Sequence, residues 1–138
     1  MVSERRDCGH GASKNERFRG AVLQATLRDD NGAIVCETCT IARNAFTRMR
    51  GLLGRRGLAE GEGLLLQPAG SIHTFFMRFP IDVVFLDRER RVLRVVSSVP
   101  PWRAAAAKRA RAVLELAAGE AARVGMTPGM VLRWEAEE

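Results

Sequence analysis

Short runs of alternating and apolar residues, separated by turn-forming residues, dominate the pattern of this 138-residue chain. Residues 21–28 alternate weakly and precede Asp29-Asp30-Asn31-Gly32, and residues 33–42 follow it. An Asn-Gly pair between two such runs is a strong hairpin signal, because both residues adopt the left-handed backbone of a tight turn. The pattern therefore predicts an antiparallel hairpin over 21–42.

A second hairpin is predicted further along the chain, where residues 81–86 and 92–99 flank the charged segment 87–91. Other short apolar runs end at glycine or proline, which interrupt strands. They predict additional strands at 64–66, 112–117 and 130–134.

Helical periodicity is confined to short stretches. Residues 45–53 follow Asn44, a suitable N-cap, and place apolar side chains on one helical face. Residues 119–125 fit one or two helical turns. The alanine-rich residues 104–110 lack an apolar stripe, so we expect a surface loop or a single turn there.

Many short strands with two short helices predict a mainly β (α+β) fold. We expect a compact small β-barrel or sandwich of short, largely antiparallel strands. Residues 1–18 show no periodicity and are interpreted as a flexible N-terminal tail. The rest, 19–136, is long enough for a single globular domain and too short for two.

Composition narrows the possible partners. The net charge is +6, but the basic residues are scattered and no basic motif interleaved with aromatic residues occurs, which argues against nucleic-acid binding. No apolar run is long enough to span a bilayer, and no apolar signal core lies near the N-terminus. We therefore expect a cytoplasmic protein without membrane contact, and a monomer.

Several segments, taken in order, resemble the family catalogued as domain of unknown function 192. The resemblance covers about residues 21–134. It is carried by Arg48-Met49-Arg50-Gly51-Leu52-Leu53-Gly54-Arg55, Gly61-Glu62-Gly63-Leu64-Leu65-Leu66, His73-Thr74-Phe75-Phe76-Met77, Pro80-Ile81-Asp82-Val83-Val84-Phe85-Leu86-Asp87, Val113-Leu114-Glu115-Leu116 with Gly119, and Gly125-Met126-Thr127-Pro128-Gly129. The resemblance implies a small β-barrel-like domain with short helices and no established biochemical activity.

Two acidic residues stand inside apolar runs, Asp82 at 81–86 and Glu115 at 112–117. A buried carboxyl group needs hydrogen bonds or an ion pair, because unpaired burial costs a few kcal/mol. For Asp82 we favour a structural role as acceptor for backbone amides or for Arg48. The alternative is that either acid contacts a ligand.

The segment from Ser71 to Asp87 concentrates aromatic and lone polar residues. Ligand sites are mostly apolar with a few convergent polar groups. We therefore predict a non-catalytic binding module with an apolar cleft for a small molecule or an extended peptide, requiring no cofactor. Its expected ligand-binding residues are Arg48, His73, Phe76, Met77, Asp82 and Glu115.

Two alternatives remain open. His73 and Asp82 form an acid/base pair in an enzyme if their side chains converge, although no nucleophile motif accompanies them. Alternatively, Cys8, His10, Cys36 and Cys39 compose a structural zinc site. Against zinc, Cys36 and Cys39 fall on a predicted strand, where residues three apart point to opposite faces.

Overall fold

The computed structural model describes residues 22–43 and 55–135. Within these ranges the chain is mainly β, with eight strands and one short helix. The predicted tail, the predicted helix at 45–53 and the candidate residues Cys8, His10 and Arg48 lie outside the described residues.

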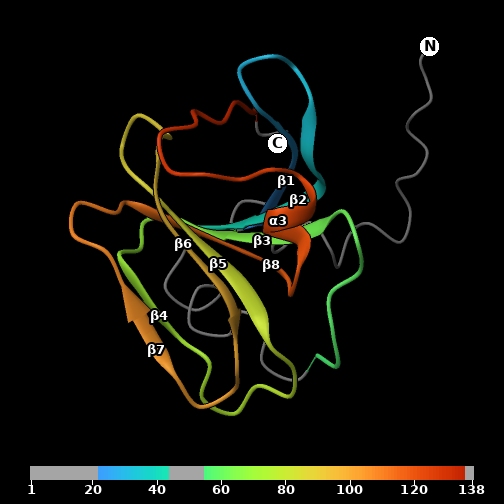
Figure 1. Ribbon diagram of the computed structural model, residues 1–138, viewed down its shortest axis with the longest axis vertical. Helices are drawn as coiled ribbons and strands as arrows, with labels where there is room; N and C mark the ends of the chain where they lie inside the picture. Colours follow the sequence, from blue (N-terminus) through green and yellow to red (C-terminus); the bar gives the residue numbers. More distant parts are fainter. Residues whose placement is uncertain (1–21, 44–54, 136–138) are drawn as a thin grey trace.

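Six strands form one sheet in the order β1-β2-β3-β8-β5-β6 (Figure 1). Neighbouring strands are antiparallel except for the parallel pair β2–β3. The sheet is open, which corrects the barrel alternative and leaves the sandwich-like one. The strands are β1 Val22–Arg28, β2 Ile34–Ala42, β3 Glu62–Leu66, β5 Ile81–Leu86, β6 Val92–Val99 and β8 Ala112–Ala117.

A second, two-stranded sheet pairs β4 (Ser71–His73) with β7 (Ala104–Ala106). The two strands lie together on one side of the six-stranded sheet in Figure 1. We predicted a loop or a single turn at 104–110, and this expectation was wrong for β7. Alanines carry no alternating pattern, and these three form a strand because β4 supplies the hydrogen-bonding partner.

Apolar side chains fill both faces of the six-stranded sheet, because successive residues of a strand point to opposite faces. On one face they pack beneath the short helix in a helix-side core that includes Leu27, Ile41, Leu65, Val84, Leu114 and Ala121. On the other face they pack against the small sheet in a β4-side core that includes Leu64, Ile72, Met77, Val83, Phe85 and Val113.

Both predicted hairpins are present as β1–β2 and β5–β6. In β2 the alternation is interrupted, because Ala25 pairs with Cys39 whereas Leu27 pairs with Cys36. The extra residue on β2 is a β-bulge. It turns Cys36 and Cys39 into the same helix-side core, contrary to our expectation of opposite faces.

Past β8, the chain forms helix α3 (Glu120–Arg123), a single turn at the predicted place. It is the one helix within the described residues, and the other predicted helix, at 45–53, falls outside them.

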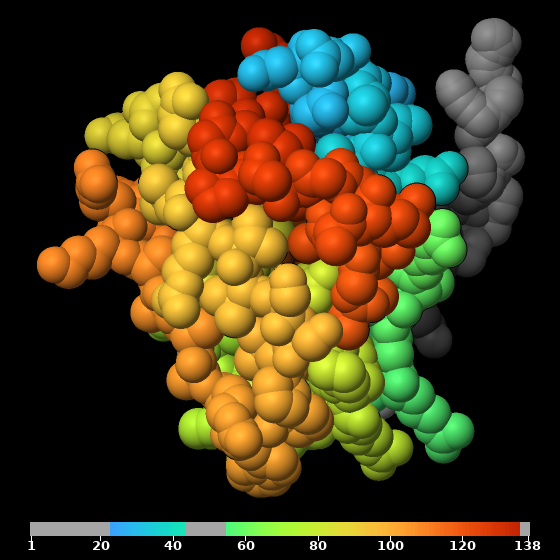
Figure 2. Space-filling model, viewed as in Figure 1, coloured from blue at the N-terminus to red at the C-terminus, as the bar shows by residue number. Residues whose placement is uncertain are grey.

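We predicted a strand at 130–134, but these residues form single pairings instead, Arg133 with Arg28 and Val131 with Arg91. We call residues 130–134 the C-terminal strap. Figure 2 shows the red C-terminal residues between the blue β1–β2 hairpin and the yellow strands. The strap thus contacts β1 at one edge of the sheet and the start of β6 at the other.

Candidate functional site

Two loops meet at one end of the small sheet. The first is the turn 74–77 that follows β4, and the second is the segment 100–103 that precedes β7. Because His73 pairs with Ala104, the β4–β7 register brings these loops side by side. Most of the exposed aromatic side chains of the described residues come from them.

Thr74 holds the two loops together from a fully buried position. Its hydroxyl donates to the Pro100 carbonyl at 2.7 Å and accepts from the Arg103 amide at 2.8 Å. Its carbonyl accepts from the Trp102 amide at 2.9 Å. A hydroxyl that both donates and accepts in this way fixes one loop relative to the other.

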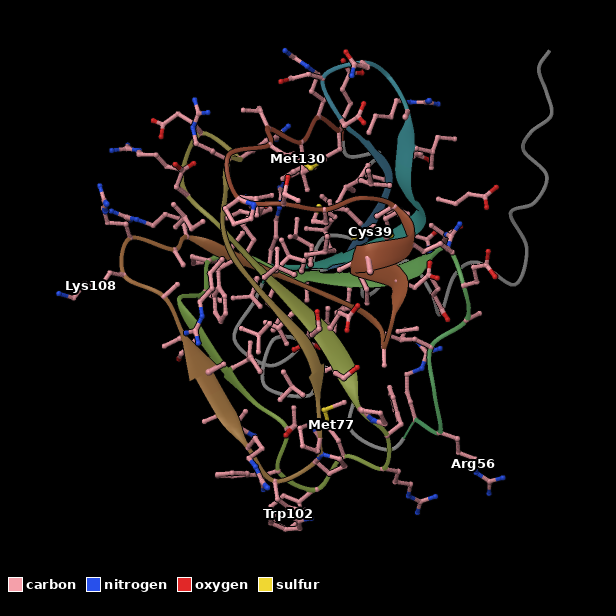
Figure 3. The ribbon with its side chains drawn as sticks, in the orientation of Figure 1. Cys39, Arg56, Met77, Trp102, Lys108 and Met130 are labelled. Atoms are coloured by element: carbon pink, nitrogen blue, oxygen red, sulfur yellow. The ribbon has the colours of Figure 1, made fainter. Side chains whose placement is uncertain are left out.

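Four rings project from this frame and form what we call the aromatic tip, His73, Phe75, Phe76 and Trp102. Ring centroids lie 4.8 Å apart for His73–Phe75, 5.8 Å for the stacked pair Phe75–Trp102, and 4.6 Å for the edge contact Phe76–Trp102. Even so, Phe76 is 69% exposed, Trp102 54% and Phe75 40%. Trp102 lies at one end of the long axis of the molecule in Figure 3.

The backbone at the tip is strained. Phe76 and Trp102 both have φ of 69°, in the left-handed region that favours glycine. The Met77 amide donates to the Thr74 carbonyl, which closes a turn with Phe76 at its third position. A bulky residue with positive φ costs of order 1–2 kcal/mol, and such strain clusters at functional sites.

His73 lies beside the rings with its side chain exposed. Its Nδ1 accepts a hydrogen bond from the Phe75 amide at 3.2 Å. Nε2 has no hydrogen-bond partner within the described residues, so it is available to a ligand.

Asp82 lies elsewhere, on the helix-side face of β5. Its Oδ1 accepts from the Ser98 amide at 2.8 Å, and Oδ2 accepts from the amides of Gly119 and Ala121 at 3.0 and 2.8 Å. Both oxygens are therefore used to hold the start of α3 and the end of β6. His73 is on the small sheet at the opposite face, so the acid/base pair required by the enzyme alternative does not form.

Glu115 points from β8 into the β4-side core, between its paired neighbours Leu64 and Val83. It forms no hydrogen bond or ion pair with the described residues. Burial alone raises the pKa of this carboxyl group from 4.5 to about 8, because the charged form loses its hydration.

Met77 is also buried in the β4-side core, beneath the turn that displays Phe76. Of the six residues predicted to bind a ligand, the structure thus brings His73 and Phe76 together at the surface. It places Met77, Asp82 and Glu115 in the interior, and Arg48 is outside the described residues.

The two described cysteines contact each other. A hydrogen bond from Cys39 lowers the pKa of the Cys36 thiol, while the same contact and burial raise the pKa of Cys39. The Cys36 sulfur also donates to the Gly61 carbonyl at 3.7 Å. No cluster of three metal-ligating side chains occurs in ranges 22–43 and 55–135, and the other two residues of the zinc alternative are not among them.

Sequence reasoning missed the role of Thr74 and did not place Trp102 among the binding residues. Trp102 lies close to His73 only through the pairing of β4 with β7, and alanines gave no signal of that pairing. The signal that could have found Thr74 is its position inside the segment His73–Met77, directly before two adjacent phenylalanines.

Comparison with known proteins adds the family. The model of DUF192, described as "Uncharacterized ACR", matches residues 25–134. The chain belongs to the DUF192 family. Among curated proteins, none matches this chain.

Solved structures show that the fold is shared. A protein of unknown function from Novosphingobium aromaticivorans is 26% identical with a TM-score of 0.69, over 82% of this DUF192 chain and 85% of that one. A "putative transcription regulator" from Sinorhizobium meliloti is 22% identical with a TM-score of 0.69, over 83% of this chain and 94% of that one. The second likeness supports the fold alone.

A third structure, a "Putative exported protein" from Burkholderia pseudomallei, is 14% identical with a TM-score of 0.51. The match covers 83% of this DUF192 chain and 25% of that larger one. Across the described residues, no helix has the length and apolar character needed to cross a bilayer.

Proposed function

We propose that this DUF192 chain is a non-catalytic binding module whose contact surface is the aromatic tip and whose ligand is an extended peptide. The observation that carries the proposal is the pair Phe76 and Trp102. Each is a large, exposed apolar side chain held on a backbone that glycine would adopt without strain.

Aromatic side chains of this kind are over-represented among the residues that dominate binding energies. Exposed apolar groups that gather in one place mark contact surfaces more often than scattered ones do. The buried Thr74 holds both loops in place, so the partner meets a preorganised surface and a smaller ordering cost.

The shape of the tip favours a peptide over an enclosed small molecule. Small-molecule sites are concave and bury most of their ligand. Here the rings project from two loops at an end of the molecule (Figure 3). A projecting surface of this kind packs against an extended segment, whose side chains lie on either side of the rings.

In the test, short random peptides are selected for binding to the purified protein, and their affinities are measured by fluorescence anisotropy. We expect Phe76→Gly and Trp102→Gly to weaken the selected peptides at least about tenfold, as is usual for residues at the centre of an interface. Cross-peaks of the Trp102 indole and the His73 ring should shift on titration. We expect Thr74→Val to weaken binding and Thr74→Ser to retain it.

Ser98→Gly is the matched control. Ser98 is exposed and has φ of 50°, so the substitution relieves the same kind of strain at a residue that contributes no ring to the tip. It should leave binding unchanged. Selected peptides whose affinity is the same for wild type, Phe76→Gly and Trp102→Gly would contradict the proposal, as would a selection that yields no peptide for the wild type.

A further inference from the structure

We propose that the segment held at the aromatic tip is acidic and lies from Trp102 along the β4–β7 sheet toward Lys108. This inference rests on the proposed function and names the chemistry of its ligand. It follows from the charges around the tip, which are all of one sign.

The two chain segments that build the tip and the small sheet, residues 67–80 and 100–110, contain no aspartate or glutamate. They contain four basic residues, all exposed, namely Arg78, Arg103, Lys108 and Arg109. The ion pairs among the described residues involve Arg55, Arg123 and Arg133 instead. The four cations of these two segments thus form no ion pair with described acids, although the whole chain carries 16 acidic residues.

Three basic residues, Arg103, Arg94 and Lys108, are distributed along β7. Arg103 comes directly after Trp102 and donates to its carbonyl at 3.3 Å. Beyond β7, Lys108 lies far from Trp102, toward the other end of the small sheet (Figure 3). Between them, Arg94 reaches from β6 and donates to the Ala106 carbonyl at 2.6 Å. An extended chain rises about 3.3 Å per residue, so a segment of about six residues would span from Trp102 to Lys108.

The distribution along β7 favours a peptide over an anionic membrane surface. A bilayer attracts cations that surround the point of contact, whereas here they extend away from the projecting rings along β7. The ring contacts also argue against single-stranded nucleic acid. Phe75 and Trp102 stack on each other at an interplanar angle of 24°, and Phe76 packs edge-on against Trp102, so these faces are partly occupied and less open to bases.

The test uses three synthetic peptides of equal length that share one central phenylalanine and leucine. Their other positions are aspartate and glutamate in the first, asparagine and glutamine in the second, and lysine in the third. We expect the acidic peptide to bind at least about tenfold more tightly than the amide peptide, with an advantage that shrinks as salt is added.

Single substitutions locate the contact. Arg103→Gln and Lys108→Gln should each weaken the acidic peptide about twofold to fivefold, the range measured for exposed charge pairs, and leave the amide peptide unchanged. Arg56→Gln is the matched control, because Arg56 is equally exposed and lies on a different part of the molecule (Figure 3).

The outcomes separate the two proposals. If the acidic and amide peptides bind equally well and both lose binding in Trp102→Gly, the proposal of an acidic ligand is overturned. The proposal of a binding module is then retained. Absence of binding by all three peptides would overturn the acidic ligand, and a random selection that also yields no peptide would overturn the binding module as well. Trp102-dependent sedimentation with phosphatidylserine vesicles, or Trp102-dependent binding of oligo-dT, without preference for the acidic peptide, would overturn the inference in favour of lipid or nucleic acid.

Discussion

Asp82 and Glu115 are both buried carboxylic acids on adjacent central strands, yet their surroundings differ. Asp82 faces α3 and accepts hydrogen bonds from three backbone amides. Glu115 faces the opposite core and receives no hydrogen bond from the described residues. Both oxygens of Asp82 are therefore hydrogen-bonded, whereas burial favours the neutral form of the Glu115 carboxyl group and raises its pKa.

We expect Asp82→Asn to lower the free energy of unfolding by about 3 kcal/mol, measured by urea denaturation. The amide nitrogen of asparagine would face backbone N–H donors that now bond to Oδ2. Asp87→Asn is the control, because Asp87 accepts hydrogen bonds from two backbone amides through Oδ1 alone. The side-chain oxygen of asparagine can accept the same two bonds. Equal losses for both variants would contradict the assigned role.

Glu115 gives the protein a specific pH dependence. The folded protein keeps this proton up to about pH 8, whereas an unfolded glutamic acid releases it near 4.5. Between these values the folded state binds more protons than the unfolded state, so stability falls as pH rises.

We expect the free energy of unfolding of the wild type, relative to Glu115→Gln, to fall by up to about 1.4 kcal/mol per pH unit between about pH 5 and pH 8. Urea midpoints of both proteins across this range provide the measurement. The glutamine variant is matched in size and does not titrate. Parallel curves for the two proteins would show that Glu115 is charged in the fold.

At the scale of elements, Gly63 allows β3 to fit between its neighbours. A Cβ atom there would lie 2.8 Å from the Cys36 sulfur, 2.9 Å from Leu116 Cδ2 and 3.2 Å from the Glu115 carbonyl. Two of these atoms belong to side chains of adjacent strands. The bulge that turns Cys36 inward therefore requires a residue without a side chain opposite it.

We expect Gly63→Ala to destabilise the protein by about 2 kcal/mol, because the added methyl overpacks the sheet. Gly57→Ala is the control, since a Cβ there meets nothing within 4 Å. Combining Gly63→Ala with Cys36→Ala should cost less than the sum of the two single changes. Additive losses by chemical denaturation would mean that the methyl clashes with backbone alone.

Local signals in the sequence predicted most of the large sheet. The Asn-Gly turn fixed the first hairpin, and the apolar runs at 81–86 and 112–117 coincide with β5 and β8. The strand β7 could not be predicted, because its alanines show neither the alternating pattern of a strand nor the periodicity of an amphipathic helix. The shared face of Cys36 and Cys39 could not be predicted either, because a bulge is set by strand pairing.

For the whole molecule, strands distant in sequence lie next to each other. β3 pairs with β8, where Leu65 is opposite Leu114, and β8 separates β3 from β5. Pairing of this kind must close long loops before its contacts form, which slows folding.

We expect refolding from urea in milliseconds to seconds rather than microseconds. Stopped-flow fluorescence can follow it through the buried Trp134 in a Trp102→Phe background, because Trp102 is exposed and reports on the tip. Relaxation that is complete within microseconds would contradict the expectation that long-range pairing limits the rate.

For the candidate site too, the sequence could not show which residues from distant parts of the chain come together in the fold. His73 and Phe76 were identified because they are neighbours in one unusual segment. Trp102 completes the tip from another loop, and only the three-dimensional register joins them. Asp82 and Glu115 were correctly recognised as unusual, but their opposite directions depend on the alternation of strands that are not adjacent in sequence.

The C-terminal strap has a consequence for how the protein behaves at high concentration. The outer strands of an open sheet are templates for pairing with another chain, and so for aggregation. The strap occupies one end of each edge, through two hydrogen bonds between Arg28 and Arg133 and through the Leu132 amide on the Arg90 carbonyl. Resistance to aggregation therefore depends on a few residues of the strap, and their loss should appear as light scattering before it appears as unfolding.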